Sequence, residues 1–249
     1  MPLSTNQGPY GGGTPVTISG TNLSNPIAVY FGGNLGTSVV GVDSTHVTVV
    51  SPAGAGAVEL IVETSSGKSN PMPYYYIQPP FISELSPVNG ATAGTNTVTI
   101  SGVGLTSVSS VMFGATAGTS INAINDGSIT VVVPDGVTAG TVNVSVTTSG
   151  GIASGLEYTY VDPPTTAGIT PGSGSESGGT VITLTGTNLT TTSLVTVGGT
   201  LSNFIVVDDS TITVITPAGS GVVDVQVTTV GGAASPLTSA FTYGALPAI

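Results

Sequence analysis

The stretch Val16-Thr-Ile-Ser-Gly-Thr-Asn-Leu23 decides the fold, because its pattern occurs three times in the chain. It returns as Val98-Thr-Ile-Ser-Gly-Val-Gly-Leu105 and as Ile182-Thr-Leu-Thr-Gly-Thr-Asn-Leu189. Repeats of a solenoid are about 20–50 residues long, and this spacing is larger, so each copy has the size of a small domain with its own core. We therefore predict three domains in tandem.

Each copy reads as a set of short strands. Val58, Leu60 and Val62 alternate with Glu59 and Glu63, which places the apolar side chains on one face and the acidic ones on the other. The second and third copies repeat the alternation with Val142, Val144 and Val146, and with Val223, Val225 and Val227. Glycine and Asn/Asp clusters separate the strands, and no segment has a helical period. We predict an all-β fold.

Further landmarks recur in the same order and set the domain boundaries. They are Phe31-Gly-Gly33, Phe113-Gly-Ala115 and Val197-Gly-Gly199; Pro52-Ala-Gly54, Pro134-Asp-Gly136 and Pro217-Ala-Gly219; and the closing tyrosines Tyr76, Tyr160 and Tyr243. We expect domains at residues 1–78, 79–162 and 163–249. Diprolines at 79–80 and 163–164 favour stiff, extended linkers, so we expect a rod.

These motifs resemble the IPT/TIG domain, and the third copy shows the pattern most fully. Its matching residues are Pro171, Gly178-Gly-Thr180, Gly186-Thr-Asn-Leu189, Gly198-Gly199, Pro217-Ala-Gly219 and Gly231-Gly232. The resemblance covers nearly the whole chain and implies three tandem immunoglobulin-like β-sandwiches, as in bacterial IPT/TIG surface or secreted proteins. The same family includes modules of starch-acting enzymes, receptor ectodomains and DNA-binding domains, so the resemblance does not specify a function.

The composition excludes several of those functions. Only 5% of the residues are charged, with 12 Asp+Glu against the single cation Lys68, whereas an average soluble domain is about 25% charged. One cation cannot neutralise a run of phosphates, so we expect no nucleic-acid partner. Without cysteine, neither a disulfide framework nor a thiolate metal site can form. The chain also has no apolar run long enough for membrane insertion and no signal peptide in the sequence as given.

Candidate chemical sites all have simpler interpretations. His46 follows Asp43 and Ser44 in one turn, where Asp and Ser side chains typically hydrogen-bond to the backbone. Asp208 and Asp209 supply too few oxygens for Ca²⁺, which takes about six to eight. Tyr75 is the one tyrosine of Tyr74-Tyr-Tyr76 that we expect on the outer face, where it could contact a ligand such as a glycan. We expect no enzyme and no catalytic, cofactor or metal site.

The two ends of the chain fit each other in the repeat alignment. Leu3 aligns with Leu85, so the first domain has no residues matching Pro79 to Ile82, and its first strand is truncated. Beyond the closing Tyr243, Pro247 aligns with Pro80 and Ala248-Ile249 with Phe81-Ile82. If a second copy followed, Met1 would take the place of Ser83 without gap or insertion.

We therefore expect a structural protein that self-assembles head to tail into an extracellular or particle-surface fibre. The tail of one subunit would complete domain 1 of the next, because a truncated edge exposes backbone groups to another chain. The expected interface residues are Met1, Pro2, Leu3, Leu246, Pro247, Ala248 and Ile249. Two alternatives stay open: a monomeric adhesive or carbohydrate-binding array, and domain ends that simply fray.

Overall fold

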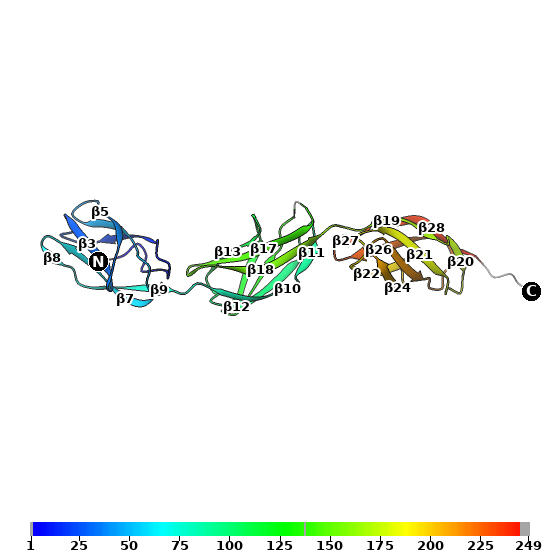
Figure 1. The fold of residues 1–249 in the computed structure, drawn as a ribbon, viewed down its shortest axis with the longest axis horizontal. Coiled ribbons are helices and arrows are strands. Elements are labelled where there is room, and N and C mark those ends of the chain that lie inside the picture. The colour runs from blue at the N-terminus through cyan, green and yellow to red at the C-terminus, as the bar shows by residue number, and fades with distance from the viewer. Residues whose placement is uncertain (1, 137, 245–249) are drawn as a thin grey trace, which may run out of the picture. The chain divides into compact units, whose positions relative to one another are not determined.

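The computed structural model describes residues 2–136 and 138–244. These residues form strands, turns and loops, and none of them lies in a helix (Figure 1). Over these ranges, accordingly, no helix has the length and apolarity needed to span a bilayer. The all-β prediction is confirmed.

The first repeat contains two sheets. Its strands are β1 (Gln7–Pro9), β2 (Pro15–Ser19), β3 (Pro26–Phe31), β4 (Asn34–Leu35), β5 (Thr37–Gly41), β6 (His46–Val50), β7 (Gly56–Thr64), β8 (Gly67–Lys68) and β9 (Met72–Ile77). One sheet has the order β2-β6-β5, and the other has the order β1-β9-β7-β3-β4, with β8 paired to β7.

The second repeat has the same plan, with a fourth strand in its smaller sheet. Its strands are β10 (Phe81–Ser86), β11 (Asn89–Ala91), β12 (Thr97–Val103), β13 (Val108–Phe113), β14 (Thr116–Ala117), β15 (Thr119–Asn125), β16 (Ser128–Val132), β17 (Gly140–Thr148) and β18 (Gly151–Val161). The sheets have the orders β10-β12-β16-β15 and β11-β18-β17-β13-β14.

The third repeat also has a four-stranded and a larger sheet. Its strands are β19 (Thr165–Thr170), β20 (Ser173–Ser175), β21 (Val181–Thr187), β22 (Thr192–Val197), β23 (Thr200–Leu201), β24 (Asn203–Asp208), β25 (Thr211–Ile215), β26 (Gly221–Thr229), β27 (Gly232–Ala233) and β28 (Leu237–Gly244). The orders are β19-β21-β25-β24 and β20-β28-β26-β22-β23, with β27 on β26.

The repeats differ at one sheet edge. In the second repeat β10 pairs along β12 from Phe81 opposite Val103 to Ser86 opposite Thr99, and β19 covers β21 in the same way. In the first repeat the described pairing along the equivalent edge of β2 is confined to a bridge between Leu3 and Ile18, with the Ser4 amide bonded to the Thr17 carbonyl oxygen and the Ser19 amide bonded to the Pro2 carbonyl oxygen. The first repeat thus has a three-stranded sheet where the others have four strands.

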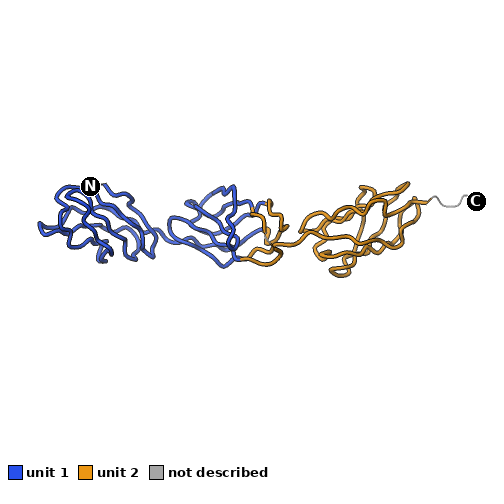
Figure 2. Tube along the Cα trace, turned by 90° about the horizontal axis from the view of Figure 1, so that it is seen from above, with its two compact units in different colours: residues 1–86, 97–132, 143–156 blue, residues 87–96, 133–142, 157–249 orange. Residues whose placement is uncertain are grey.

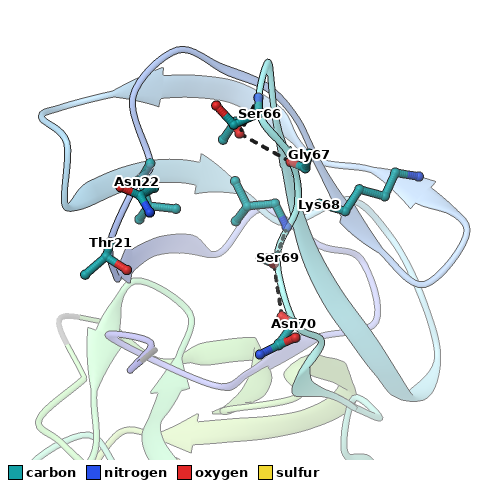
Figure 3. Close-up of a pocket in the computed structure, with 10 residues that line it drawn as sticks. Thr21, Asn22, Ser66, Gly67, Lys68, Ser69 and Asn70 are labelled. Carbon is teal, nitrogen blue, oxygen red and sulfur yellow. Dashed lines mark hydrogen bonds between the residues drawn. The ribbon is translucent and has the colours of Figure 1, made fainter.

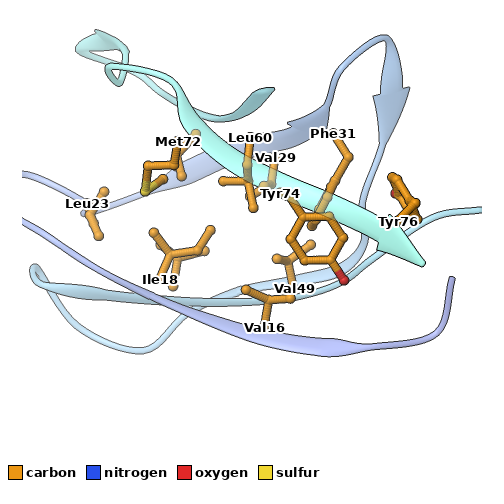
Figure 4. Packing of buried hydrophobic residues seen from close by; sticks show 12 residues of the cluster. Val16, Ile18, Leu23, Val29, Phe31, Val49, Leu60, Met72, Tyr74 and Tyr76 are labelled. Atoms are coloured by element: carbon orange, nitrogen blue, oxygen red, sulfur yellow. The ribbon is translucent and has the colours of Figure 1, made fainter. Parts of the chain in front are cut away.

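The alternating side chains form the cores, as the sequence predicts. In the first repeat Leu60 and Val62 are fully buried and Val58 packs partly against them. Figure 4 shows Leu60 and Tyr74 from one sheet facing Ile18 from the other. The Tyr74 ring also meets Phe31 edge to face at 4.8 Å between ring centroids. Burial of such side chains stabilises each sandwich by about 1.5–3 kcal/mol per residue.

The closing tyrosine of each repeat fastens the last strand to a turn. The Tyr76 hydroxyl donates to the Pro52 carbonyl oxygen at 2.8 Å, and Gly54 packs so closely against the ring that a Cβ there would overlap it. Burial of the ring raises the pKa of Tyr76 to about 12. The same tyrosine-to-proline bonds occur in the other repeats, from Tyr160 to Pro134 and from Tyr243 to Pro217.

The chain divides into two compact units (Figure 2). One consists of residues 1–86, 97–132 and 143–156, and the other of residues 87–96, 133–142 and 157–249. The division passes through the second repeat, since β17 and β18 each have residues in both units. The first repeat lies wholly in one unit and the third wholly in the other.

One tyrosine position shows how a hydrogen bond to a buried hydroxyl group affects stability. The Tyr74 hydroxyl is buried and has no hydrogen-bond partner among the described residues, whereas the equivalent Tyr158 hydroxyl donates to Asn96 Oδ1 at 2.9 Å. The third repeat has Phe241 at this position. We therefore expect Tyr74→Phe to raise the free energy of unfolding by about 1 kcal/mol and Tyr158→Phe to lower it by about 1 kcal/mol.

Native-state hydrogen exchange measures the stability of each repeat separately. The amides of β9 report on Tyr74→Phe, and the amides of β18 report on Tyr158→Phe. The two variants serve as controls for each other, since each removes one hydroxyl from the same position of a sandwich. Equal destabilisation by both changes would contradict the expectation.

Candidate functional site

The residues around His46 form a turn cap. His46 Nδ1 lies 3.0 Å from Asp43 Oδ2, and Asp43 Oδ1 accepts hydrogen bonds from the amide and the hydroxyl of Thr45. These bonds, above all the one from the Thr45 hydroxyl, lower the pKa of Asp43 to about 2. The geometry holds the turn that leads into β6, as expected for Asp at such a position.

Asp208 and Asp209 also cap turns. Asp208 Oδ1 accepts from the Ser210 hydroxyl at 2.7 Å, and Asp209 Oδ1 accepts from the Thr190 hydroxyl at 2.7 Å. These hydroxyls are the main cause that lowers the pKa of each carboxyl. Within residues 2–136 and 138–244 no group of three or more His, Cys, Asp and Glu side chains could hold a metal ion.

Tyr75 lies on the outer face of β9. It is 45% exposed, while Tyr74 and Tyr76 on either side are 0% and 6% exposed. The predicted orientation of the three tyrosines is therefore confirmed. The suggestion that Tyr75 contacts a ligand stays a prediction.

The expected interface residues are described only in part. Met1, Leu246, Pro247, Ala248 and Ile249 lie outside the described residues. Pro2 and Leu3 lie beside β2, where the Ser19 amide donates to the Pro2 carbonyl oxygen at 3.0 Å. Leu3 is half-buried and packs against the core of the first repeat.

A pocket of about 340 Å³ opens beside the same edge of the first repeat. Its walls are the turn after β2, Thr21–Leu23, and the hairpin at the end of β7, Ser66–Asn70, with Val62 and Thr64 between them. We call this pocket the socket. Figure 3 shows Thr21 and Asn22 on one side of it, Ser66 and Ser69 on the other, and the Lys68 side chain directed away from Asn22. No pattern in the sequence predicts this pocket.

In the second repeat the equivalent place is occupied by the linker that enters the repeat. Gly104 and Gly150 align with Asn22 and Ser66. A Cβ on Gly150 would overlap the carbonyl oxygen of Gln78, and a Cβ on Gly104 would lie 3.4 Å from Pro80 Cα. The linker therefore packs directly on the two segments that wall the socket in the first repeat.

The third repeat seats its linker in the same way. The Asn188 side-chain amide donates to the Pro163 carbonyl oxygen at 3.1 Å, and the Thr187 and Thr165 hydroxyls lie 2.8 Å apart. A Cβ on Gly231 would overlap the carbonyl oxygen of Asp162. A hydrogen bond from the first wall and a glycine in the second wall hold the segment that precedes the repeat.

The socket has the same residue as the third repeat in its first wall and a different one in its second wall. Asn22 has φ 58°, and its counterpart Asn188 has φ 57°. Ser66 has a side chain where the other repeats have Gly150 and Gly231, although its amide donates to a threonine Oγ1 as theirs do. The change from glycine to serine is visible in the repeat alignment. The structure explains why it matters, because the linker carbonyl lies against the glycine in the other two repeats.

The IPT/TIG domain model matches the chain three times, at residues 1–76, 80–160 and 164–243. The predicted tandem of three immunoglobulin-like sandwiches is confirmed. No curated protein matches the chain.

Several solved structures are similar to the chain at low identity. The extracellular region of plexin A4 is 21% identical with a TM-score of 0.46, and the match covers 89% of this chain and 21% of that one. The SGBP-B of a xyloglucan utilization locus in Bacteroides uniformis is 19% identical over 92% of this chain and 65% of that one, with a TM-score of 0.35. The Escherichia coli adhesin FdeC is 14% identical over 98% and 96%, with a TM-score of 0.37.

These likenesses carry no conclusion about what the chain binds or builds, because every TM-score is below 0.5. The chain also covers only between 21% and 57% of the length of the first three matched structures.

The linker contact can be tested by exchanging the glycine for the serine of the socket. We expect Gly150→Ser to displace the Gln78 carbonyl and to lower the free energy of unfolding of the second repeat by about 1–3 kcal/mol, as overpacking does. Hydrogen exchange of the β10 amides should accelerate. Ser66→Gly is the matched control, since Ser66 lines an open pocket among the described residues, and it should cost less than about 1 kcal/mol. Unchanged exchange of β10 in Gly150→Ser would contradict the role of the glycine.

Proposed function

The chain belongs to the IPT/TIG domain family, in three copies, and on this premise we propose that it is a non-catalytic structural subunit that assembles end to end into a fibre. The fibre would be extracellular or lie on the surface of a particle. The observation that carries this proposal is the open edge of β2 in the first repeat.

Strand edges of this kind pair readily with another chain. Six-residue strands cover the same edge in the second and third repeats, whereas the described pairing in the first repeat ends with the Ser19 amide bonded to Pro2. Exposed N–H and C=O groups beyond that point can extend a sheet by one strand. Natural proteins often guard such edges with lysine, and the one lysine of this chain, Lys68, lies on β8 instead.

The tail of a second copy supplies the missing strand in register. Phe81 and Ile82 pair with Val103 and Gly102 in the second repeat. The aligned residues are Ala248 and Ile249 of the tail and Thr21 and Gly20 of the first repeat. Each subunit would use different surfaces at its two ends, and such heterologous contacts continue into open filaments unless the rotation closes a ring.

Removal of the tail tests the assembly. We expect the intact chain to form fibres whose length increases with protein concentration, and the chain lacking Leu246–Ile249 to sediment as a folded monomer. Negative-stain images and analytical ultracentrifugation provide the readouts. As a control, the synthetic hexapeptide Gly244–Ile249 added in excess should shorten the fibres of the intact chain. The proposal fails if the intact chain stays monomeric at all concentrations, or if the deletion leaves the fibres unchanged.

The exposure of Tyr75 supports one second candidate, a monomeric adhesive or carbohydrate-binding array. Aromatic faces such as Tyr75 are common contact surfaces. On the fibre proposal, Tyr75→Ala should assemble like the intact chain, and neither protein should bind a glycan array above background. Glycan binding by the intact chain that Tyr75→Ala abolishes would establish the alternative.

A further inference from the structure

We infer that the socket of the first repeat binds residues Ala245–Pro247 of a second copy of the chain, and that Ser66 makes it select this tail over the diproline linkers. This inference rests on the proposed end-to-end assembly and names the surface and the residues that would give it specificity. The socket adjoins the β2 edge, so a tail that pairs with the edge must cross the socket first.

The two internal linkers show what the socket can hold. Residues Gln78–Pro80 lie against Gly104 and Gly150 of the second repeat, and Pro163 accepts a hydrogen bond from Asn188 of the third. In the first repeat the same two walls enclose about 340 Å³ of open space. Five residues follow Gly244 in the chain, and the segment Gln78–Ile82 that crosses the walls and begins the strand is also five residues long.

Asn22 provides a donor for the tail. Asn188 donates to the carbonyl oxygen of Pro163 at 3.1 Å, and Leu246 is the tail residue that aligns with Pro163. Asn22 lines the socket and shares the left-handed backbone of Asn188, with φ values within one degree of each other, so its side chain starts from the same position on the wall. The inferred bond therefore runs from Asn22 Nδ2 to the Leu246 carbonyl oxygen.

Ser66 excludes a linker that follows the internal path. The carbonyl oxygens of Gln78 and Asp162 come so close to Gly150 and Gly231 that neither glycine could carry a Cβ, and Ser66 carries one. Gln78 and Asp162 both precede a proline, which confines them to extended backbone and fixes the direction of their carbonyls.

The tail differs from the linkers at the facing position. Ala245 aligns with Gln78 and Asp162, but it precedes Leu246 instead of a proline. Its peptide group is free of the restriction that proline imposes, so its carbonyl can turn away from the Ser66 side chain. The first repeat has Ser66 in place of glycine, and the tail has Leu246 in place of proline. In the inferred complex these two differences lie opposite each other, and each accommodates the other.

Exchanging these residues in the intact chain tests the selectivity. We expect Leu246→Pro, which restores the diproline, to raise the concentration needed for assembly about tenfold, which corresponds to about 1.4 kcal/mol. Ser66→Gly combined with Leu246→Pro should restore assembly, because the glycine again admits the fixed carbonyl. Ser66→Gly alone is the reference for the double variant, because it removes the side chain and keeps Leu246. Light scattering over a concentration series measures all four proteins, and circular dichroism confirms that each is folded.

The donor is tested separately with Asn22→Gly. Glycine accepts the positive φ of this position and is the residue found at 104, so the change removes the amide with little strain. The concentration needed for assembly should rise about three- to tenfold, the equivalent of one net hydrogen bond.

A direct binding measurement separates this inference from the proposed function. The hexapeptide Gly244–Ile249 is titrated into dilute intact chain, and amide shifts in the NMR spectrum should concentrate on Thr21–Leu23 and Ser66–Asn70. Shifts confined to other regions, or a failure of Ser66→Gly to rescue Leu246→Pro, would overturn the inference. If fibres form and depend on the tail but ignore every socket variant, the inference fails and the assembly stands. If the peptide binds the socket but no fibres form, the assembly fails and the socket stands.

Discussion

The contact between a linker carbonyl and a glycine determines how each later repeat begins. Gly150 and Gly231 let the carbonyls of Gln78 and Asp162 approach to a distance that any side chain would prevent. The diproline segment packs against these glycines, and the residues that follow it form β10 and β19 at the sheet edge. In both repeats with a four-stranded sheet, the linker carbonyl thus lies against a position without a Cβ. The first repeat has Ser66 there and a three-stranded sheet.

Because few residues are charged, this protein is stabilised mainly by backbone hydrogen bonds and by the burial of apolar side chains. Among the described residues, the one close contact between a basic and an acidic side chain joins His46 and Asp43, and both are exposed, where such contacts contribute little. Tyrosine hydroxyls bond to carbonyl oxygens of prolines, and aspartates bond to turn amides and hydroxyls. Contacts of this kind are screened little by salt. Contact between two copies through backbone groups and small polar side chains would extend the same chemistry from within the chain to between chains.

The sequence predicts the fold well because strand patterns are local. Alternation within five residues, as in Val58–Val62, identifies a half-buried strand without knowledge of its neighbours, and the threefold repetition supports each assignment. The socket escaped prediction because its walls, Thr21–Leu23 and Ser66–Asn70, are far apart in sequence and meet only in the folded repeat. The unsatisfied Tyr74 hydroxyl is likewise invisible in sequence, since Tyr158 looks identical and does have a partner.

Asn22 and Ser66 differ in whether their local backbone accounts for the residue type. Asparagine tolerates positive φ better than most residues, so the turn alone explains Asn22 whether or not its amide meets a ligand. Ser66 has no such local explanation, because its counterparts are glycines that touch a linker. A side chain is permitted at this position only where no carbonyl follows the linker path. The first repeat therefore cannot receive an Xaa-Pro-Pro segment in the way the other two do, and any chain that docks there must have a freer backbone. Specificity then comes from a steric exclusion rather than from an added attraction.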